Sequence, residues 1–210
     1  MQLKIQIPRL ILVVAIAGIL LGCGGDSKEG GTDQNQSSGD KGNSKSGGNE
    51  VALTEANQVK SVNNAGSIRK SLVRYMQGSK DRKFPLADTW CDDIKREAQT
   101  QLIFLSPQLP QTKELWDKVK KATNEDQWIQ VSHYALNSRL SGKDEFELMR
   151  EVHIGLLVSI FECDLGWNGS GGLEDALKYM DKYKLEKIAV SLGSGSSRSV
   201  TQEELKKLEW

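Results

Sequence analysis

The sequence has no net charge and few of the residue types that build common catalytic sites. It carries 28 basic and 28 acidic residues, and its only histidines are His133 and His153. A nucleic-acid-binding domain would be expected to show a basic excess, and no polybasic stretch accompanies the N-terminal segment. Neither nucleic-acid binding nor electrostatic recognition of lipid is therefore indicated.

The sequence patterns of several common functional sites are missing as well. Two histidines without a Cys or His partner at ligand spacing do not make a zinc site. No Gly-x-Ser-x-Gly element is present for a serine nucleophile, and the glycine-rich stretches 166–172 and 193–195 do not contain the Lys-Ser or Lys-Thr pair of a phosphate-binding loop. We therefore expect no catalytic residue of these types, no resident metal and no cofactor.

Long hydrophobic runs are absent from the chain except at its beginning. Residues 10–21 are apolar throughout and follow Lys4 and Arg9. This run is shorter than the ~20 residues that cross a bilayer, and its basic start and small-residue end are typical of a secretion signal. Without Lys4 and Arg9, the remaining chain is slightly acidic.

The end of this run, Leu20-Leu21-Gly22-Cys23, resembles the lipobox of bacterial lipoproteins. The resemblance implies that residues 1–22 are a signal peptide and that Cys23 is diacylated and becomes the new N-terminus. Each buried methylene adds ~0.8 kcal/mol, so two or three acyl chains hold a domain stably on a membrane. The alternatives are an ordinary cleaved signal or an uncleaved membrane anchor, and either would still export the domain.

The residue after the anchor bears on localisation. Gly24 stands where an aspartate commonly signals retention in the inner membrane. We therefore expect the domain on the extracytoplasmic face of a membrane, with the outer membrane preferred over the cytoplasmic membrane.

A polar segment separates the anchor from the rest of the chain. Residues 26–50 contain no aliphatic or aromatic residue. Such a segment does not bury enough apolar surface to offset the entropy of ordering it. We therefore predict that residues 23–50 form a flexible tether after the lipidated cysteine, and that residues 51–210 form one globular domain.

Hydrophobic periodicity predicts the elements of this domain. Apolar residues three or four apart indicate a long helix from Leu53 to Met76, ended by Gly78. Shorter helices are predicted over residues 87–100, 112–122 and 173–180. Two further helices are predicted after the capping-box spacings Asp144/Glu147 and Thr201/Glu204. Short apolar or alternating runs predict strands over residues 102–105, 128–134, 152–161, 187–192 and 197–200.

From about residue 57 to its end, the chain also carries a series of short phrases in a particular order. They are Asn63-Asn64, Tyr75 through Phe84-Pro85, Ala87-Asp88-Thr89-Trp90-Cys91-Asp92, Ile103-Phe104-Leu105-Ser106-Pro107, Tyr134-Ala135-Leu136-Asn137, Leu140-Ser141-Gly142-Lys143, Phe161-Glu162-Cys163-Asp164-Leu165-Gly166-Trp167-Asn168, Gly193 to Val200 and Leu205 to Trp210. This series resembles the secreted prepilin-like or pseudopilin-like proteins that are abundant in planctomycetes.

The resemblance implies a pilin-like α+β fold, with a long N-terminal helix packed on an antiparallel sheet and additional short helices. Two departures accompany it. Prepilins begin with a processed hydrophobic helix that drives polymerisation, and here a lipobox occupies that place. The family ends with a His, nine residues and Asp-Gly, and this chain has Lys184 and Ser194-Gly195 at those positions.

The remaining cysteines, Cys91 and Cys163, would lie in an oxidising compartment after export. A disulfide between them would close a loop of about 70 residues and would stabilise the domain by roughly 4 kcal/mol. The alternative is a pair of buried free thiols. A reactive nucleophile is not indicated, because neither cysteine has a motif that supplies a base.

The best candidates for a ligand site follow the most apolar predicted strand. Glu162 and Asp164 stand two residues apart, so in a strand they would point to the same side and would be available as an acid–base pair or as calcium ligands. The glycine-rich loop after them adds the side-chain oxygen of Asn168, and Trp167 is a candidate platform for sugar or protein. The alternative is a simple turn in which Trp167 anchors the loop.

Two functions from different classes follow from these features. The first is a non-enzymatic, lipid-anchored structural or interaction protein of the bacterial envelope, with an envelope protein or a secretion-system component as partner. The second is an envelope hydrolase or glycan-binding module centred on Glu162, Asp164 and Trp167. Carboxylates with a raised pKa in a cleft would favour the second, and a shallow, uncharged surface would favour the first.

Overall fold

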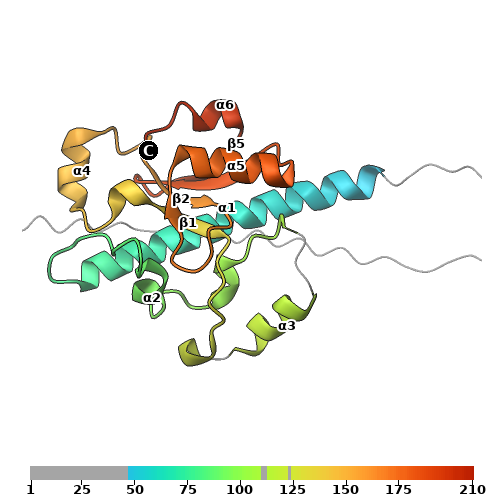
Figure 1. Ribbon diagram of the computed structural model, residues 1–210, viewed down its shortest axis with the longest axis horizontal. Coiled ribbons are helices and arrows are strands. Elements are labelled where there is room, and N and C mark those ends of the chain that lie inside the picture. Colours follow the sequence, from blue (N-terminus) through green and yellow to red (C-terminus); the bar gives the residue numbers. More distant parts are fainter. Residues whose placement is uncertain (1–46, 110–112, 123) are drawn as a thin grey trace, which may run out of the picture. The chain divides into compact units, whose positions relative to one another are not determined.

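A computed structural model describes residues 47–109, 113–122 and 124–210 of the chain (Figure 1). The predicted signal peptide, Cys23 and nearly all of the predicted tether lie outside the described residues. The elements in chain order are α1 (Gly47–Gly78), α2 (Trp90–Ile94), η1 (Gln101–Phe104), α3 (Lys113–Lys121), η2 (Glu125–Gln127), β1 (Tyr134–Asn137), η3 (Ser138–Leu140), α4 (Glu145–Glu151), β2 (Val158–Glu162), β3 (Ser170–Gly171), α5 (Leu173–Tyr183), β4 (Ile188–Leu192), β5 (Ser197–Val200) and α6 (Gln202–Leu205).

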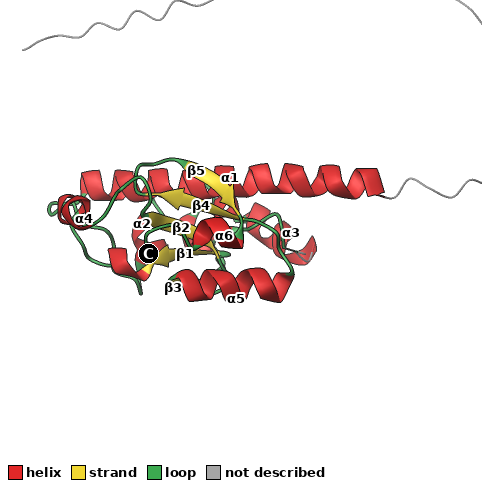
Figure 2. Cartoon of the chain, turned by 90° about the horizontal axis from the view of Figure 1, so that it is seen from above, coloured by secondary structure: helices red, strands yellow, loops and turns green. Residues whose placement is uncertain are grey.

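The strands form one sheet in the order β3-β1-β2-β4-β5. All neighbouring pairs are antiparallel except β1 and β3. Figure 2 shows α1 along one side of this sheet and α5 on the other side. The predicted fold class is confirmed, because a long N-terminal helix packs against a mostly antiparallel sheet and short helices complete the domain.

Alternation along the strands divides the buried apolar residues between two clusters. Tyr134 and Leu136 of β1 belong to the cluster that contains the buried face of α1. Ala135, between them, belongs to the cluster under α5 and α6. Successive residues of a strand point to opposite faces, so the central strands are buried on both sides.

The long helix α1 has 32 residues and is therefore about 48 Å long. Ala65, Ile68 and Leu72 of the predicted apolar stripe are fully buried, whereas Val59 of the same stripe is 61% exposed. Gly66 lies in the helix interior, where a glycine costs stability. A Cβ atom at this position would come within 3.1 Å of Ser197 Oγ on β5, so the glycine permits a close approach of the helix to the sheet.

Several predicted helix starts are confirmed. The Asp144 carboxylate accepts hydrogen bonds from the backbone N–H groups of Phe146 and Glu147 at the start of α4. Thr201 and Glu204 form a complete capping box before α6. The helices α3 and α5 and the strands β4 and β5 also lie where the periodicity predicts them. These elements share strong local signals in their own sequence.

Other predicted elements are wrong or too long. The apolar run 102–105, predicted as a strand, lies mostly in the 3-10 helix η1, whose start is capped by the Thr100 side chain. Of residues 128–134 only Tyr134 is in a strand, and β2 begins at Val158 rather than at residue 152. The predicted helix 87–100 is reduced to α2. A short apolar run signals burial but has no period that separates a strand from a turn.

None of the helices in the described part of the chain combines the length and the apolar composition needed to cross a membrane.

Candidate functional site

The carboxylate of Glu162 lies at the centre of a buried polar cluster. Glu162 ends β2, and its side chain is fully buried. Its Oε1 accepts a hydrogen bond from Ser106 Oγ at 2.6 Å, and its Oε2 accepts from Gln108 Nε2 and from the backbone N of Ala189, each at 2.7 Å. Three segments that are distant in the sequence therefore converge on one carboxylate.

The surroundings of Glu162 are neutral. No lysine or arginine in the described residues forms an ion pair with it. Burial raises the pKa of Glu162, and the hydrogen bonds, led by that of Ser106, act in the opposite direction. A carboxylate in such an environment takes up a proton more readily than one in water.

Two tyrosines lie close enough to respond to this carboxylate. Tyr134 lies opposite Glu162 in the β1–β2 pair, and its hydroxyl donates to the backbone carbonyl of Ser61 on α1 at 3.2 Å. Tyr179 approaches from α5. Burial, and after it the charge of Glu162, raises the pKa of both phenols. Both phenols are therefore neutral at physiological pH, and the Tyr179 hydroxyl is buried without a hydrogen-bond partner among the described residues.

Asp164 belongs to a different environment. It follows the end of β2, and its Oδ2 accepts hydrogen bonds from Tyr183 Oη at 2.8 Å and from Lys182 Nζ, both on α5. Burial is the largest single influence and would raise the pKa of Asp164, but these hydrogen bonds together lower it. The strand ends at Glu162, so Asp164 does not share the strand alternation on which the predicted pairing rested, and the two carboxylates contact different partners.

Trp167 and Asn168 hold the glycine-rich loop against α2. Trp167 is partly buried, with its ring centroid 5.3 Å from that of Phe104, and its Nε1 donates to Asp92 Oδ1 at 3.1 Å. Asn168 Oδ1 accepts from the backbone N of Cys91 at 2.7 Å, and its Nδ2 donates to Asp92 Oδ2 at 2.7 Å. In this arrangement Trp167 anchors the loop, as in the alternative interpretation.

The predicted disulfide between Cys91 and Cys163 is not formed. Both are buried free thiols. Cys91 packs in the cluster beside α1, and Cys163 packs in the cluster under α5, so they lie in different parts of the core. Burial raises the pKa of the Cys91 thiol strongly and that of Cys163 to about 12. The structure therefore agrees with the alternative interpretation, in which both cysteines are buried free thiols.

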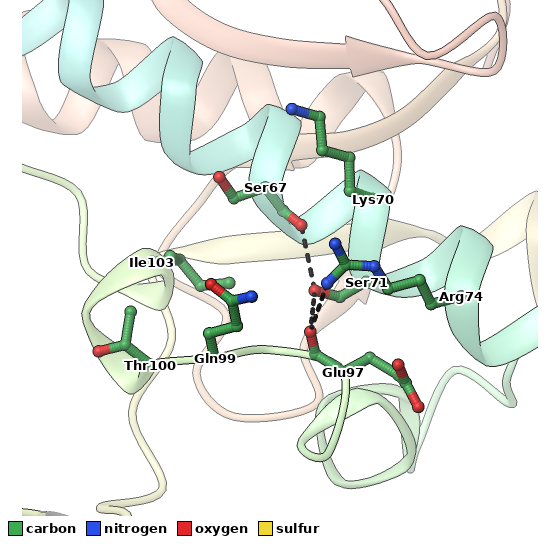
Figure 3. A pocket seen from close by; sticks show the side chains of 8 residues that line it. All are labelled: Ser67, Lys70, Ser71, Arg74, Glu97, Gln99, Thr100 and Ile103. Carbon is green, nitrogen blue, oxygen red and sulfur yellow. Dashed lines mark hydrogen bonds between the residues drawn. The ribbon is translucent and has the colours of Figure 1, made fainter.

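A shallow hollow of about 240 Å³ lies between α1 and residues 97–103 (Figure 3). Ser71 Oγ lies 3.1 Å from the backbone carbonyl oxygens of both Ser67 and Glu97, so its single proton is shared between them, and Arg74 Nη1 donates to the Glu97 carbonyl at 3.4 Å. These contacts hold the backbone of Glu97 against α1. No group of three or more His, Cys, Asp or Glu side chains in the described ranges is arranged to hold a metal ion.

Arg69 is a buried charge that the sequence analysis did not single out. Its side chain is 3% exposed, and its Nη2 donates to Gly193 O at 2.9 Å and to Glu145 Oε1 at 3.1 Å. The guanidinium also lies 5.5 Å from the ring centroid of Phe84. Ser106 and Gln108 were missed too, because a Ser-Pro pair and a single Gln after a short apolar run belong to no ligand-binding motif. Nothing in the local sequence marks these residues as partners of Glu162 or Glu145.

Comparison of the chain with known protein families, curated proteins and solved structures finds no match.

Proposed function

We propose that this protein is a non-enzymatic structural or interaction protein of the bacterial envelope, anchored by lipid on Cys23. The globular domain is its working part on the extracytoplasmic face, and its partner is an envelope protein or a secretion-system component. The lipobox, the tether and the prepilin-like phrases support this function. They rest on the sequence, and the fold adds a pilin-like arrangement of one long helix on a sheet.

The observation that carries the proposal is the closure of the Glu162 cluster. A hydrolase or glycan-binding site needs carboxylates that reach a substrate in a cleft. Glu162 has no exposed surface and directs both oxygens to donors inside the protein. Asp164 faces α5, and Trp167 faces α2. The alternative function therefore has no accessible site in the described residues that unites its three residues.

The anchor is tested by intact mass measurement on protein purified from its native membrane, compared with Cys23→Ala. We expect a mature chain that begins at Cys23 and carries acyl chains, and we expect Cys23→Ala to keep its signal peptide and to lose the acyl mass. Separation of the two membranes on a density gradient tests the preference for the outer membrane. A wild-type chain with an unmodified N-terminus would contradict the proposal.

A further inference from the structure

The strand β5 has one side without a strand partner in the described part of the chain. It is an edge of the sheet and pairs with β4 on its other side. The backbone N of Leu192 donates to Ser196 O at 2.8 Å, and the register continues through Val190 opposite Arg198. Alternate residues of an antiparallel strand turn their backbone groups to opposite sides. The N–H and C=O groups of Ser197 and Ser199 therefore point to the free edge.

The other side of β4 is consistent with this alternation. The backbone N of Ala189 donates to Glu162 Oε2, and that of Gly193 donates to Leu157 O at 2.7 Å. Odd-numbered residues of β4 thus direct their N–H groups toward β2, and even-numbered residues direct theirs toward β5. The partner of Ala189 in the register is Ser199, whose backbone groups are consequently left for another strand.

A groove of about 390 Å³ runs between this edge and α1. Figure 2 shows β5 and α1 beside each other along this side of the domain. On the α1 side, Val59 is 61% exposed and Val62 is partly exposed, and the polar residues Glu55, Gln58 and Asn63 complete the lining. Ser199 Oγ is buried at the groove and has no hydrogen-bond partner. The groove therefore combines an unpaired strand edge with two exposed or partly exposed valines on the facing helix.

The groove carries one charge of each sign, Glu55 on α1 and Arg198 on β5 itself. Arg198 is exposed and lines the groove, and it forms no ion pair with the described carboxylates. It contributes to lowering the pKa of Glu204, but the Glu204 carboxylate is occupied in the capping box with Thr201. On β5 itself, the charge that an added strand would lie beside is the positive charge of Arg198, whereas Glu55 lies across the groove on α1.

This charge also bears on which strand would bind. A second copy of β5 that used both Ser197 and Ser199 in antiparallel pairing would place its Arg198 directly opposite the first Arg198. Like charges directly opposite each other in a sheet are destabilising. The edge is better matched to a different chain with an acidic residue at that position.

We propose that the free edge of β5 binds an extended segment of a partner protein, which adds to the sheet as a further strand. An Asp or Glu of that segment lies opposite Arg198. The residues on either side of it pair with the backbones of Ser197 and Ser199 and turn apolar side chains toward Val59 and Val62. This inference rests on the proposed function as an interaction protein and specifies the chemistry of its partner.

The test uses the full-length chain, purified from bacterial membranes in detergent, and two synthetic peptides as probes. The first is Thr-Thr-Val-Asp-Val-Thr-Thr, and the matched control has Lys in place of Asp. Amide hydrogen exchange of residues 197 and 199 is followed by mass spectrometry. We expect the Asp peptide to slow this exchange about tenfold at a concentration near ten times its Kd, and the Lys peptide to slow it far less.

Two changes separate strand addition from other binding. Arg198→Glu should reverse the preference between the peptides, whereas Arg150→Glu, an exposed charge reversal on α4, should not. N-methylation of both valines removes backbone donors from the peptide and should abolish the effect without altering the protein. Equal slowing by both peptides, slowing that survives N-methylation, or no slowing overturns the proposal. Slowing that grows with protein concentration without peptide would assign the edge to a second copy.

The same preparation keeps the two proposals distinct. An acylated protein whose exchange is unaffected by the Asp peptide overturns the strand site and leaves the anchor in place. A protein without acyl chains that still shows peptide-dependent protection overturns the anchor and leaves the strand site in place.

Discussion

Tyr134 and Glu162 lie directly opposite each other in the β1–β2 pair, and both side chains are fully buried on the α1 side of the sheet. The Tyr134 phenol donates to the carbonyl of Ser61. The Glu162 carboxylate accepts its hydrogen bonds from Ser106, Gln108 and Ala189. The pair thereby links α1, the segment after η1 and the two central strands. A change in the protonation of Glu162 is consequently a change in the stability of the whole domain.

Glu162→Gln should remove a pH-dependent part of the stability. Burial raises the folded-state pKa of Glu162 above its unfolded value, so the folded protein binds this proton more tightly than the unfolded chain does. The stability from this group is complete below the unfolded pKa of about 4.3 and is lost as the pH rises through the raised folded pKa. We therefore expect the free energy of unfolding of the wild type to fall relative to Glu162→Gln as the pH rises from about 4 through the raised folded pKa of Glu162.

Urea unfolding at a series of pH values measures this difference. Gln is a fair replacement because the Ser106 hydroxyl is able to turn and accept from its amide nitrogen. Glu147→Gln, exposed on α4, is the matched control and should leave the pH profile of the wild type unchanged. A difference between wild type and Glu162→Gln that stays constant with pH would contradict the assignment.

Asn168→Ala should destabilise the domain by about 2 kcal/mol, because it removes a cap and strains the loop. Asn168 has a φ of 59° and caps the start of α2 through the backbone N of Cys91. Asn168→Gly loses the same hydrogen bonds but accepts the left-handed backbone, so it should cost only about 1 kcal/mol. Chemical denaturation measures both, and equal losses would show that the backbone conformation contributes nothing.

Glu145→Gln should cost about 1 to 2 kcal/mol, because it removes the charged partner of the buried Arg69. Arg69 Nε and Nη1 are buried without a hydrogen-bond partner. The hydrogen bonds of Nη2 to Glu145 and Gly193 therefore offset the cost of burying this charge. Glu147→Gln on the same helix should change the stability by less than about 0.5 kcal/mol. In an Arg69→Met background the cost of Glu145→Gln should disappear, and a double-mutant cycle in which it persists would refute the coupling.

The thiols of Cys91 and Cys163 should be unreactive in the folded protein. Burial raises the pKa of both thiols, so the reactive thiolate is scarce near about pH 8, and the sulfur atoms are covered by the core. Iodoacetamide should label neither residue in the native state and both residues in denaturant. Intact mass should not change on treatment with a reductant. A mass increase of two hydrogens on reduction would show that the disulfide between Cys91 and Cys163 exists. Rapid labelling of one thiol in the native state would contradict the burial of that cysteine.

The elements that were predicted correctly depend on neighbours within a few residues. The caps at Asp144 and Thr201 bind backbone groups two or three residues away, and the hairpin of β4 and β5 closes over a short turn with Gly195 in a left-handed conformation. The apolar period of α1 likewise repeats within each turn, and it predicted this long helix correctly. Such signals are complete in the local sequence.

The candidate site, in contrast, depends on residues that meet only in the folded chain. Ser106 and Gln108 stand 56 and 54 residues from Glu162, and the Asn168 side chain caps Cys91 across 77 residues. The spacing of Glu162 and Asp164 suggested one pair, but the end of β2 between them sends the two carboxylates to different elements. Composition and spacing are sufficient to predict a secretion signal and a polar tether, and they determine the helix periods. The partner of each polar group depends instead on how the strands pair and where each strand ends, because burial forces those groups to bond with whatever the fold brings beside them.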